Sequence, residues 1–263
     1  MAEIVLDGVD VQFRQPGKRA EPVRVLDGIG LEIADEEFVC LLGPSGCGKS
    51  TALNIIAGFV EPTAGRVTVD GRAVDGPGPD RGVVFQDANI FPWMSVARNV
   101  AFGPSVQGRL AGKELDDRVA HYLGRVGLDG FGDHLPRELS GGMRQRVGLA
   151  RVLINDPPVL LMDEPFGALD AQTRITMQEL LLELWDRDRK TVLFVTHDID
   201  EALLLGDRVL VMSARPGRIK TVVDVPLPRP RSYDVMREPA FVELKNRLFH
   251  ELRDEEERAA VTH

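Results

Sequence analysis

A glycine-rich segment between an apolar stretch and an amphipathic one constrains this chain more than any other feature. Residues 43–50, GPSGCGKS, fit the pattern GxxxxGK[ST]. Phe38–Leu42, just before them, is a short apolar run typical of a strand buried on both faces, and residues 51–59 are typical of a helix. Glycines let the backbone wind tightly, so that successive N–H groups converge on an anion, and the helix adds its positive end. The segment therefore predicts a strand, a phosphate-binding loop and a helix.

The residue types of this loop indicate a nucleotide with its metal ion. Lys49 can place a mobile positive charge on the β- and γ-phosphates, and the Ser50 hydroxyl can ligate Mg²⁺. The alternative is an ordinary glycine-rich turn with a surface lysine. The predicted nucleotide-binding residues here are Gly43, Pro44, Ser45, Gly46, Cys47, Gly48, Lys49, Ser50 and Thr51.

The pattern of strands and helices predicts an α/β protein. Two alternating stretches, 2–13 and Val23–Ile33, suggest an opening antiparallel sheet. Later strands alternate with helices, which implies a parallel sheet covered on both faces. The later strands are expected at 66–69, 82–85, 159–162, 191–195, Arg208–Met212 and 218–225, and helices at 113–126, 141–154, 172–188 and 198–205.

The chain is expected to have one main domain over 1–230, with an α-helical subdomain inserted at about 87–157. A proline-rich connection then leads to a charged tail, 231–263, predicted to be helical over 238–257. The role of this tail is left open by the sequence.

Composition narrows the function classes. The 263 residues carry a net charge of −9, which argues against a nucleic-acid surface because phosphate binding relies on clustered Lys and Arg. The two cysteines, Cys40 and Cys47, cannot build a disulfide scaffold. The N-terminus has no secretory pattern, and no stretch is long enough to cross a bilayer. The expectation is a cytoplasmic protein whose membrane role comes through partners.

A second group of acids follows another apolar run. Residues 159–162 are apolar, and Asp163 and Glu164 come directly after them. Side chains of neighbouring strand residues diverge, so the two acids can divide the work. Asp163 would hold Mg²⁺ through water, and Glu164 would act as the general base on the attacking water. The alternative is a pair of solvated acids at a strand end.

The order of the motifs then points to a family. Residues 139–146, LSGGMRQR, resemble the LSGGQ signature of ABC ATPases, with Met143 in place of the usual Gln. Ser140 is a good N-cap, and Gly141 and Gly142 open backbone amides at a helix start. Phosphate loop, signature, acid pair, Ala168-Leu169-Asp170 and His197 follow in the family's order across nearly the whole chain.

This resemblance implies further roles. Gln86 matches the glutamine that contacts Mg²⁺ and the lytic water and links to the membrane subunits. Asp170 matches the loop that couples two sites, and His197 matches the histidine that bonds the γ-phosphate. Phe13 is placed to stack on adenine, although a core position in an edge strand is the alternative. The family works as head-to-tail dimers with ATP between the two copies, so a homodimer is expected.

The resemblance extends to importers of nitrate, sulfonate and taurine, carried by residues 166–170, 196–202 and 213–219. It implies two transmembrane permease subunits, a periplasmic or lipoprotein solute-binding protein, and a peripheral position on the cytoplasmic face of the plasma membrane. Residues 89–96, rich in large apolar side chains, would receive the permease; a core segment is the alternative. A non-transport ABC ATPase and an export or lipid-transport subunit stay open, as does the solute.

Overall fold

The computed structural model describes residues 2–14 and 22–261, and it divides the chain into two units. The first comprises Met1–Gly78 and Arg189–His263, and the second comprises Pro79–Asp188. The glycine-rich loop lies in the first unit, and the signature lies in the second.

The first unit contains the buried strand predicted before the phosphate loop. All five residues of β3 (Phe38–Leu42) are buried, and its two parallel neighbours are β8 (Thr191–Thr196) and β9 (Arg208–Met212). Strand β10 (Ile219–Asp224) is antiparallel to β9 at the edge. The predicted parallel pairing is confirmed. Because β3 and β8 are in register at Leu42 and Thr196, the segments after both strands leave the sheet at the same edge.

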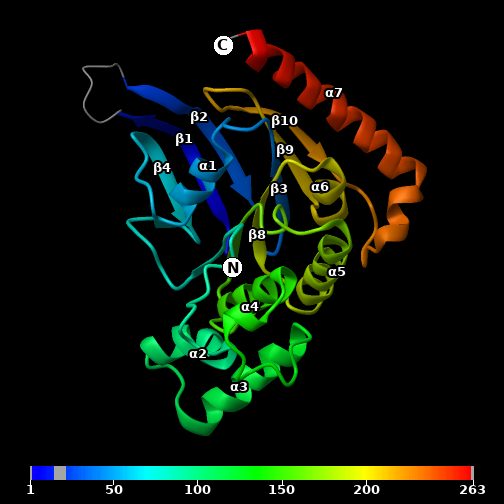
Figure 1. The fold of residues 1–263 in the computed structure, drawn as a ribbon. Helices are drawn as coiled ribbons and strands as arrows, with labels where there is room; N and C mark the ends of the chain where they lie inside the picture. Colours follow the sequence, from blue (N-terminus) through cyan, green and yellow to red (C-terminus); the bar gives the residue numbers. More distant parts are fainter. Residues whose placement is uncertain (1, 15–21, 262–263) are drawn as a thin grey trace. The chain divides into compact units, whose positions relative to one another are not determined.

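A second, antiparallel sheet in the same unit confirms the predicted opening hairpin. Its strands, in the order β2-β1-β4-β5, are β2 (Val23–Ile33), β1 (Ile4–Phe13), β4 (Ala64–Val69) and β5 (Arg72–Ala73) (Figure 1). Buried residues alternate with exposed ones along β2 and at the start of β1, as expected where one sheet face is covered. Residues 14–22 between the two alternating stretches, with Pro16, Gly17 and Pro22, predict a loop, but 15–21 lie outside the described residues.

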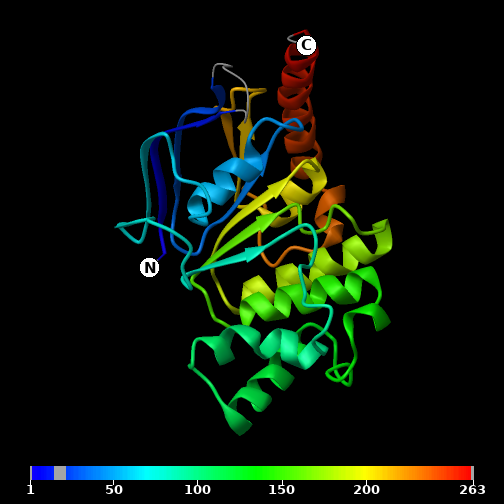
Figure 2. The ribbon, with the colours of Figure 1, turned by 60° about the vertical axis from the view of Figure 1, so that its left-hand side comes forward.

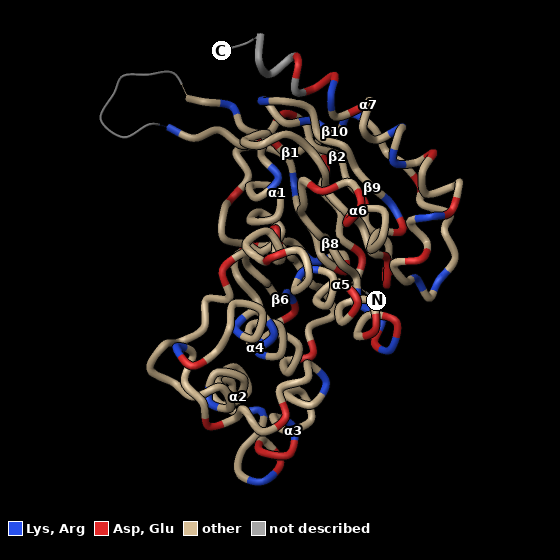
Figure 3. Tube along the Cα trace, turned by 45° about the vertical axis from the view of Figure 1, so that its right-hand side comes forward, with Lys and Arg blue, Asp and Glu red and all other residues tan. Residues whose placement is uncertain are grey.

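The described part of the first unit also contains four helical segments. They are α1 (Lys49–Ile56), α6 (Ile199–Leu205), the 3-10 turn η2 (Tyr233–Arg237) and α7 (Pro239–Val261). The tail is helical as predicted, and α7 extends alongside β10 (Figure 1). It buries Phe241 and Leu248 and carries acidic and basic residues interspersed along its length (Figure 3). The tail is thus packed into the first unit through two apolar anchors.

The second unit pairs two parallel strands, β6 (Arg81–Val84) and β7 (Val159–Asp163), with a group of helices (Figure 2). The first four residues of β7 are buried. The helices are α2 (Val96–Val106), α3 (Gly112–Arg125), the 3-10 turn η1 (Pro136–Glu138), α4 (Gly141–Leu153) and α5 (Ala171–Arg187).

Helix α2 lies inside the predicted α-helical subdomain, where no separate bounds for it were predicted from the sequence. It contains Gly103 and Pro104, which are weak helix formers. Tertiary packing overrides that weakness. A Cβ placed on Gly103 would lie 2.4 Å from Oδ1 of Asn155, so the glycine allows a close approach that a larger residue would block. No helix among the described residues is long and apolar enough to cross a membrane.

Candidate functional site

The glycine-rich loop of the first unit has the geometry of a phosphate cradle. Gly46 and Gly48 have φ angles of 76° and 111°, which favour glycine, and Gly48 is the N-cap of α1. Lys49 is buried, and its Nζ donates hydrogen bonds to the carbonyl oxygens of Gly43 at 2.8 Å and Pro44 at 3.2 Å. The ammonium group is therefore held against the loop, where a bound phosphate could take over its hydrogen bonds.

The turn between β9 and β10 contacts the phosphate loop, which the sequence did not reveal. Its Gly217 exchanges backbone hydrogen bonds with Val25 and Asp27 of β2. A Cβ placed on Gly217 would lie 2.2 Å from the carbonyl oxygen of Cys47, so the backbones touch there. Gly217, in a segment noted at first only by resemblance, thus has a packing function: its backbone contacts the phosphate loop at Cys47.

The two other predicted residues of the first unit are both exposed. Phe13, at the end of β1, is 45% exposed, which argues against the core alternative and leaves its ring accessible. His197 follows β8 directly and is exposed at the sheet edge where the phosphate loop also emerges. Cys40 and Cys47 are both buried, and burial raises the pKa of each thiol.

In the second unit, Gln86 and Glu164 lie around Gly167. A Cβ placed on Gly167 would be 3.1 Å from Nε2 of Gln86 and 3.7 Å from Oε2 of Glu164. Glu164 has a φ of 44°, a left-handed conformation that is uncommon for a residue with a long side chain. Its carbonyl accepts the amide of Gly167 at 3.0 Å. The chain thus turns sharply after β7, bringing the acid and the amide to one place.

Asp163 ends β7 and is half-buried, directly before that turn. A carboxylate, the Ser50 hydroxyl and the Gln86 amide oxygen are hard oxygen donors of the kind that Mg²⁺ prefers, so the donor set fits the ion. The residues are divided between the units: Ser50 is in the first, and Asp163 and Gln86 are in the second.

The signature and the aspartate loop meet at one threonine. Asp170 is the N-cap of α5, and its carboxylate accepts hydrogen bonds from the Thr173 amide at 3.0 Å and hydroxyl at 2.6 Å. These bonds lower the pKa of Asp170. A Cβ on Gly142 would lie 2.4 Å from Cγ2 of the same Thr173. The second signature glycine is therefore required by the packing of α4 on α5, a constraint that the motif alone does not show.

Ser140 and Gly141 are exposed at the start of α4, where Ser140 caps the helix by accepting the Met143 amide at 3.3 Å. This cap uses the backbone amide of Met143, so the substitution of Gln by Met leaves it intact. A helix start of this kind carries backbone amides that lack intrahelical partners and can bind an anion.

Helix α4 also holds the segment that follows β6. The buried Gln145 donates to the carbonyl of Phe85 at 3.1 Å, and Arg151 donates to the carbonyl of Asn89 at 2.8 Å. The Arg151 guanidinium also lies 5.2 Å from the centre of the Phe91 ring, within cation–π range. The signature helix thus holds the chain on both sides of Gln86 through contacts that no motif in the sequence indicates.

Aromatic side chains form an exposed cluster on this segment. The Phe91 ring lies 5.6 Å from the ring of Trp93 and 4.7 Å from that of Phe102, and Trp93 is 71% exposed. We call Phe91, Trp93 and Phe102 the aromatic patch. Asn99 is fully buried. Its side chain holds the backbone of Phe91 by accepting a hydrogen bond from the Phe91 amide and donating one to the Phe91 carbonyl. The exposure of Trp93 excludes the alternative that this residue belongs to the core.

Comparison with known proteins agrees with this geometry. The model of the ABC transporter family matches residues 26–167. The taurine import ATP-binding protein TauB of Rhizobium johnstonii is 51% identical over 231 residues, which cover 86% of this chain and 88% of that protein. The nitrate import ATP-binding protein NrtD of Synechocystis sp. is 48% identical over 246 residues, covering 91% and 92%.

Among solved structures, the dimeric post-hydrolysis state of the ATP-binding cassette MJ0796, bound to ADP and Pi, is 33% identical. It has a TM-score of 0.74 and covers 86% of this chain and 100% of its own. The fold and the phosphate loop define an α/β P-loop ATPase, as the sequence predicted. The chain belongs to the ABC transporter family, as an ATP-hydrolysing subunit similar to the nitrate and taurine import ATP-binding proteins.

Proposed function

We propose that this chain is the ATPase of an importer for a small solute such as nitrate, a sulfonate or taurine. The similarity to the nitrate and taurine import proteins, extending over most of each chain, supports import over export, lipid transport or a non-transport role. The observation that carries the transport part of the proposal is the exposed Trp93, because a large apolar ring in water favours a protein partner.

In this proposal the loop amides and Lys49 hold the β- and γ-phosphates, and Phe13 stacks on adenine. Glu164 takes the proton from the attacking water, His197 bonds the γ-phosphate, and Gln86 orients the water. Ser50, Asp163 and Gln86 would hold Mg²⁺, which when bound neutralises charge that develops on the phosphates. The turn at Gly167, which places Gln86 near Glu164, supports their acting on the same water.

The signature would act on a second copy of the chain. Ser140, Gly141 and Gly142 of one copy would donate to the γ-phosphate held by the phosphate loop of the other. The exposed start of α4 and the dimeric cassette among the solved structures support this homodimer. Asp170, which caps α5 and is tied to Gly142 through Thr173, would relay closure between the two sites.

The aromatic patch would receive a permease subunit. Two permeases and a periplasmic or lipoprotein solute-binding protein would complete the importer, with this chain peripheral on the cytoplasmic face. Helix α4 is hydrogen-bonded to the segment that follows β6 through Gln145 and Arg151. Movement of the patch would therefore be passed both to Gln86 and to the signature.

The test is co-expression of the chain with candidate permease subunits from the same genome. We expect Trp93→Glu to abolish co-purification and solute uptake while ATP affinity stays within about twofold. The matched control is Val222→Glu, which puts the same charge on an exposed apolar residue of β10. Loss of ATP binding in Trp93→Glu would contradict the docking role, and retained co-purification would contradict the patch as the contact.

A further inference from the structure

The helix that follows His197 is too short to hold its own position. Helix α6, Ile199–Leu205, has 7 residues, and isolated helices of fewer than about 12 residues are marginal in water. Its orientation must therefore come from the groups packed around it. The contacts that fix it lie within the first unit and come from β3 and β8 and from the C-terminal segment.

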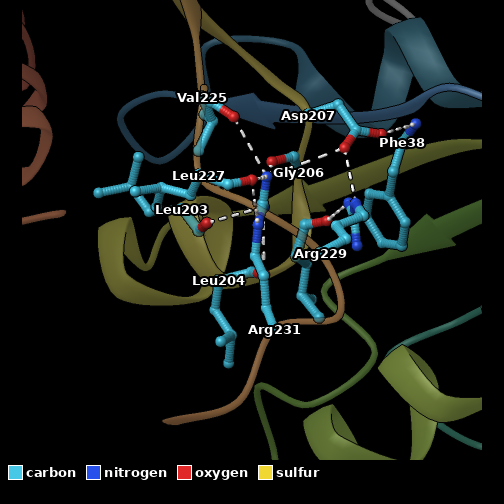
Figure 4. A network of polar contacts seen from close by, with 10 residues as sticks. Phe38, Leu203, Leu204, Gly206, Asp207, Val225, Leu227, Arg229 and Arg231 are labelled. Carbon is cyan, nitrogen blue, oxygen red and sulfur yellow. Dashed lines mark hydrogen bonds and ion pairs between the residues drawn. The ribbon is translucent and has the colours of Figure 1, made fainter. Parts of the chain in front are cut away.

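Arg231 holds the end of α6. Its guanidinium is buried and donates to the carbonyls of Leu203 at 3.1 Å, Leu204 at 3.3 Å and Gly206 at 2.6 Å (Figure 4). The same group also donates to carbonyls of its own segment, at Val225 and Leu227, and lies 3.8 Å from the Asp207 carboxylate. A cation at a helix C-terminus opposes the negative end of the dipole and satisfies carbonyls that lack intrahelical partners.

The start of α6 is joined to the residue before His197. Glu201 is 5% exposed and accepts a hydrogen bond from the hydroxyl of Thr196, which is 2% exposed. That hydroxyl also accepts the amide of Asp198 at 3.0 Å. Asp198 in turn caps α6 by accepting the Glu201 amide at 3.1 Å. His197 thus sits between two residues that share one buried hydroxyl.

The tail contacts α6 at a second place. Lys245 of α7 pairs with Asp200 of α6 at 2.7 Å. Arg229 adds a bond to the carbonyl of Leu205 and another to Asp207. Arg231 thus holds the end of α6. The Thr196–Glu201 pair holds its start, next to His197.

We propose that Arg231 and the Thr196–Glu201 pair are positioning residues for His197, so that the C-terminal segment sets the hydrolysis rate without touching nucleotide. The proposal rests on the proposed role of His197 at the γ-phosphate. Thr196→Val keeps the side-chain shape but removes the hydroxyl that bonds both the Glu201 carboxylate and the Asp198 amide. The loop between them is then free to move His197 away from its position.

The test is a set of double-mutant cycles on the purified full chain, measuring kcat and KM for ATP together with urea unfolding. We expect Thr196→Val and Arg231→Lys each to lower kcat by about tenfold or more, with KM changed by less than about threefold. Thr196→Ser restores the hydroxyl and is the rescue variant, expected within about threefold of the wild-type kcat. Arg231→Lys keeps the charge but loses the planar fork.

The cycle with His197→Ala separates positioning from general loss of structure. If Thr196 and Arg231 act through His197, their substitutions should change kcat by less than about twofold in the His197→Ala background. An undiminished loss of kcat in that background, or a wild-type kcat for Thr196→Val, would overturn the inference. A wild-type kcat for His197→Ala alone would instead remove the assigned role of His197, and the inference with it.

Discussion

The side-chain amide of Gln145 donates a hydrogen bond to the carbonyl oxygen of Phe85 at 3.1 Å, joining the signature helix to the residue before Gln86. Gln145 is buried, and Gly148 one turn further on leaves room for the backbone of Ala88, whose carbonyl oxygen would lie 3.1 Å from an added Cβ. The signature helix and the segment that follows β6, which are far apart in sequence, are thus held together by this hydrogen bond and by the close approach that Gly148 allows.

This contact gives the first prediction. Gln145→Leu removes the buried hydrogen bond to the Phe85 carbonyl and should lower the free energy of unfolding by about 1–3 kcal/mol. Urea unfolding of the purified chain measures it. Gln107→Leu, on an exposed position at the end of α2, is the control and should change stability by less than about 0.5 kcal/mol. Equal stabilities of the two variants would mean that the bond contributes nothing.

Lys49 is predicted to be required for nucleotide affinity. Lys49→Ala removes the cation that spans the loop carbonyls of Gly43 and Pro44, so the dissociation constant for ATP should rise by at least about tenfold. Fluorescence titration with a labelled ATP analogue measures this. Lys113→Ala, at an exposed lysine of α3, should leave affinity unchanged. An unchanged ATP affinity in Lys49→Ala would contradict the role of Lys49 in phosphate binding.

Glu164 is predicted to be the general base. Glu164→Gln preserves size and should keep ATP affinity, whereas single-turnover hydrolysis should slow by about a hundredfold or more because the neutral amide cannot take a proton. The variant should also accumulate as an ATP-bound dimer in gel filtration. Glu179→Gln, at an exposed site on α5, is the control. Hydrolysis at the wild-type rate in Glu164→Gln would exclude this role.

Gly142 is predicted to be limited by packing as well as by nucleotide. Gly142→Ala directs a Cβ into Cγ2 of Thr173 and should destabilise the chain by about 1–3 kcal/mol. Thr173→Ser removes that methyl group and keeps the hydroxyl that bonds Asp170, so the double variant should regain most of the loss in thermal unfolding. If the double variant is no more stable than Gly142→Ala alone, the clash with Thr173 is not the cause of the destabilisation.

The tail should contribute stability that depends on pH. The hydrogen bond from Lys220 lowers the pKa of Glu251 below its ordinary 4.5. A lowered carboxyl pKa stabilises the folded state above the ordinary value, and this contribution is lost as the pH falls through the lowered one. Glu251→Gln should therefore be less stable than wild type at neutral pH, with the difference vanishing in acid. Glu243→Gln, exposed on the same helix, should show no such trend; a pH-independent difference for Glu251→Gln would contradict the linkage.

Much of the fold was predictable because its signals are local. A continuous apolar run such as Phe38–Leu42 can be stable only with both faces covered, and the structure buries all five residues. The phosphate loop was predictable for the same reason: the positive φ angles of Gly46 and Gly48 are properties of those residues themselves. The boundaries of most elements differ by only one or two residues from those expected.

The contacts between distant segments were not predictable. Neither the close packing of Gly142 against Thr173 nor the hydrogen bonds from Arg231 to the end of α6 has a periodicity or a spacing in the chain. The left-handed turn at Glu164 likewise runs against that residue's own preference. The sequence by itself determined which chemistry the chain carries, because that resides in residue types at short spacings. Only the tertiary structure decided which residues hold that chemistry in place, because such support depends on segments brought together by folding.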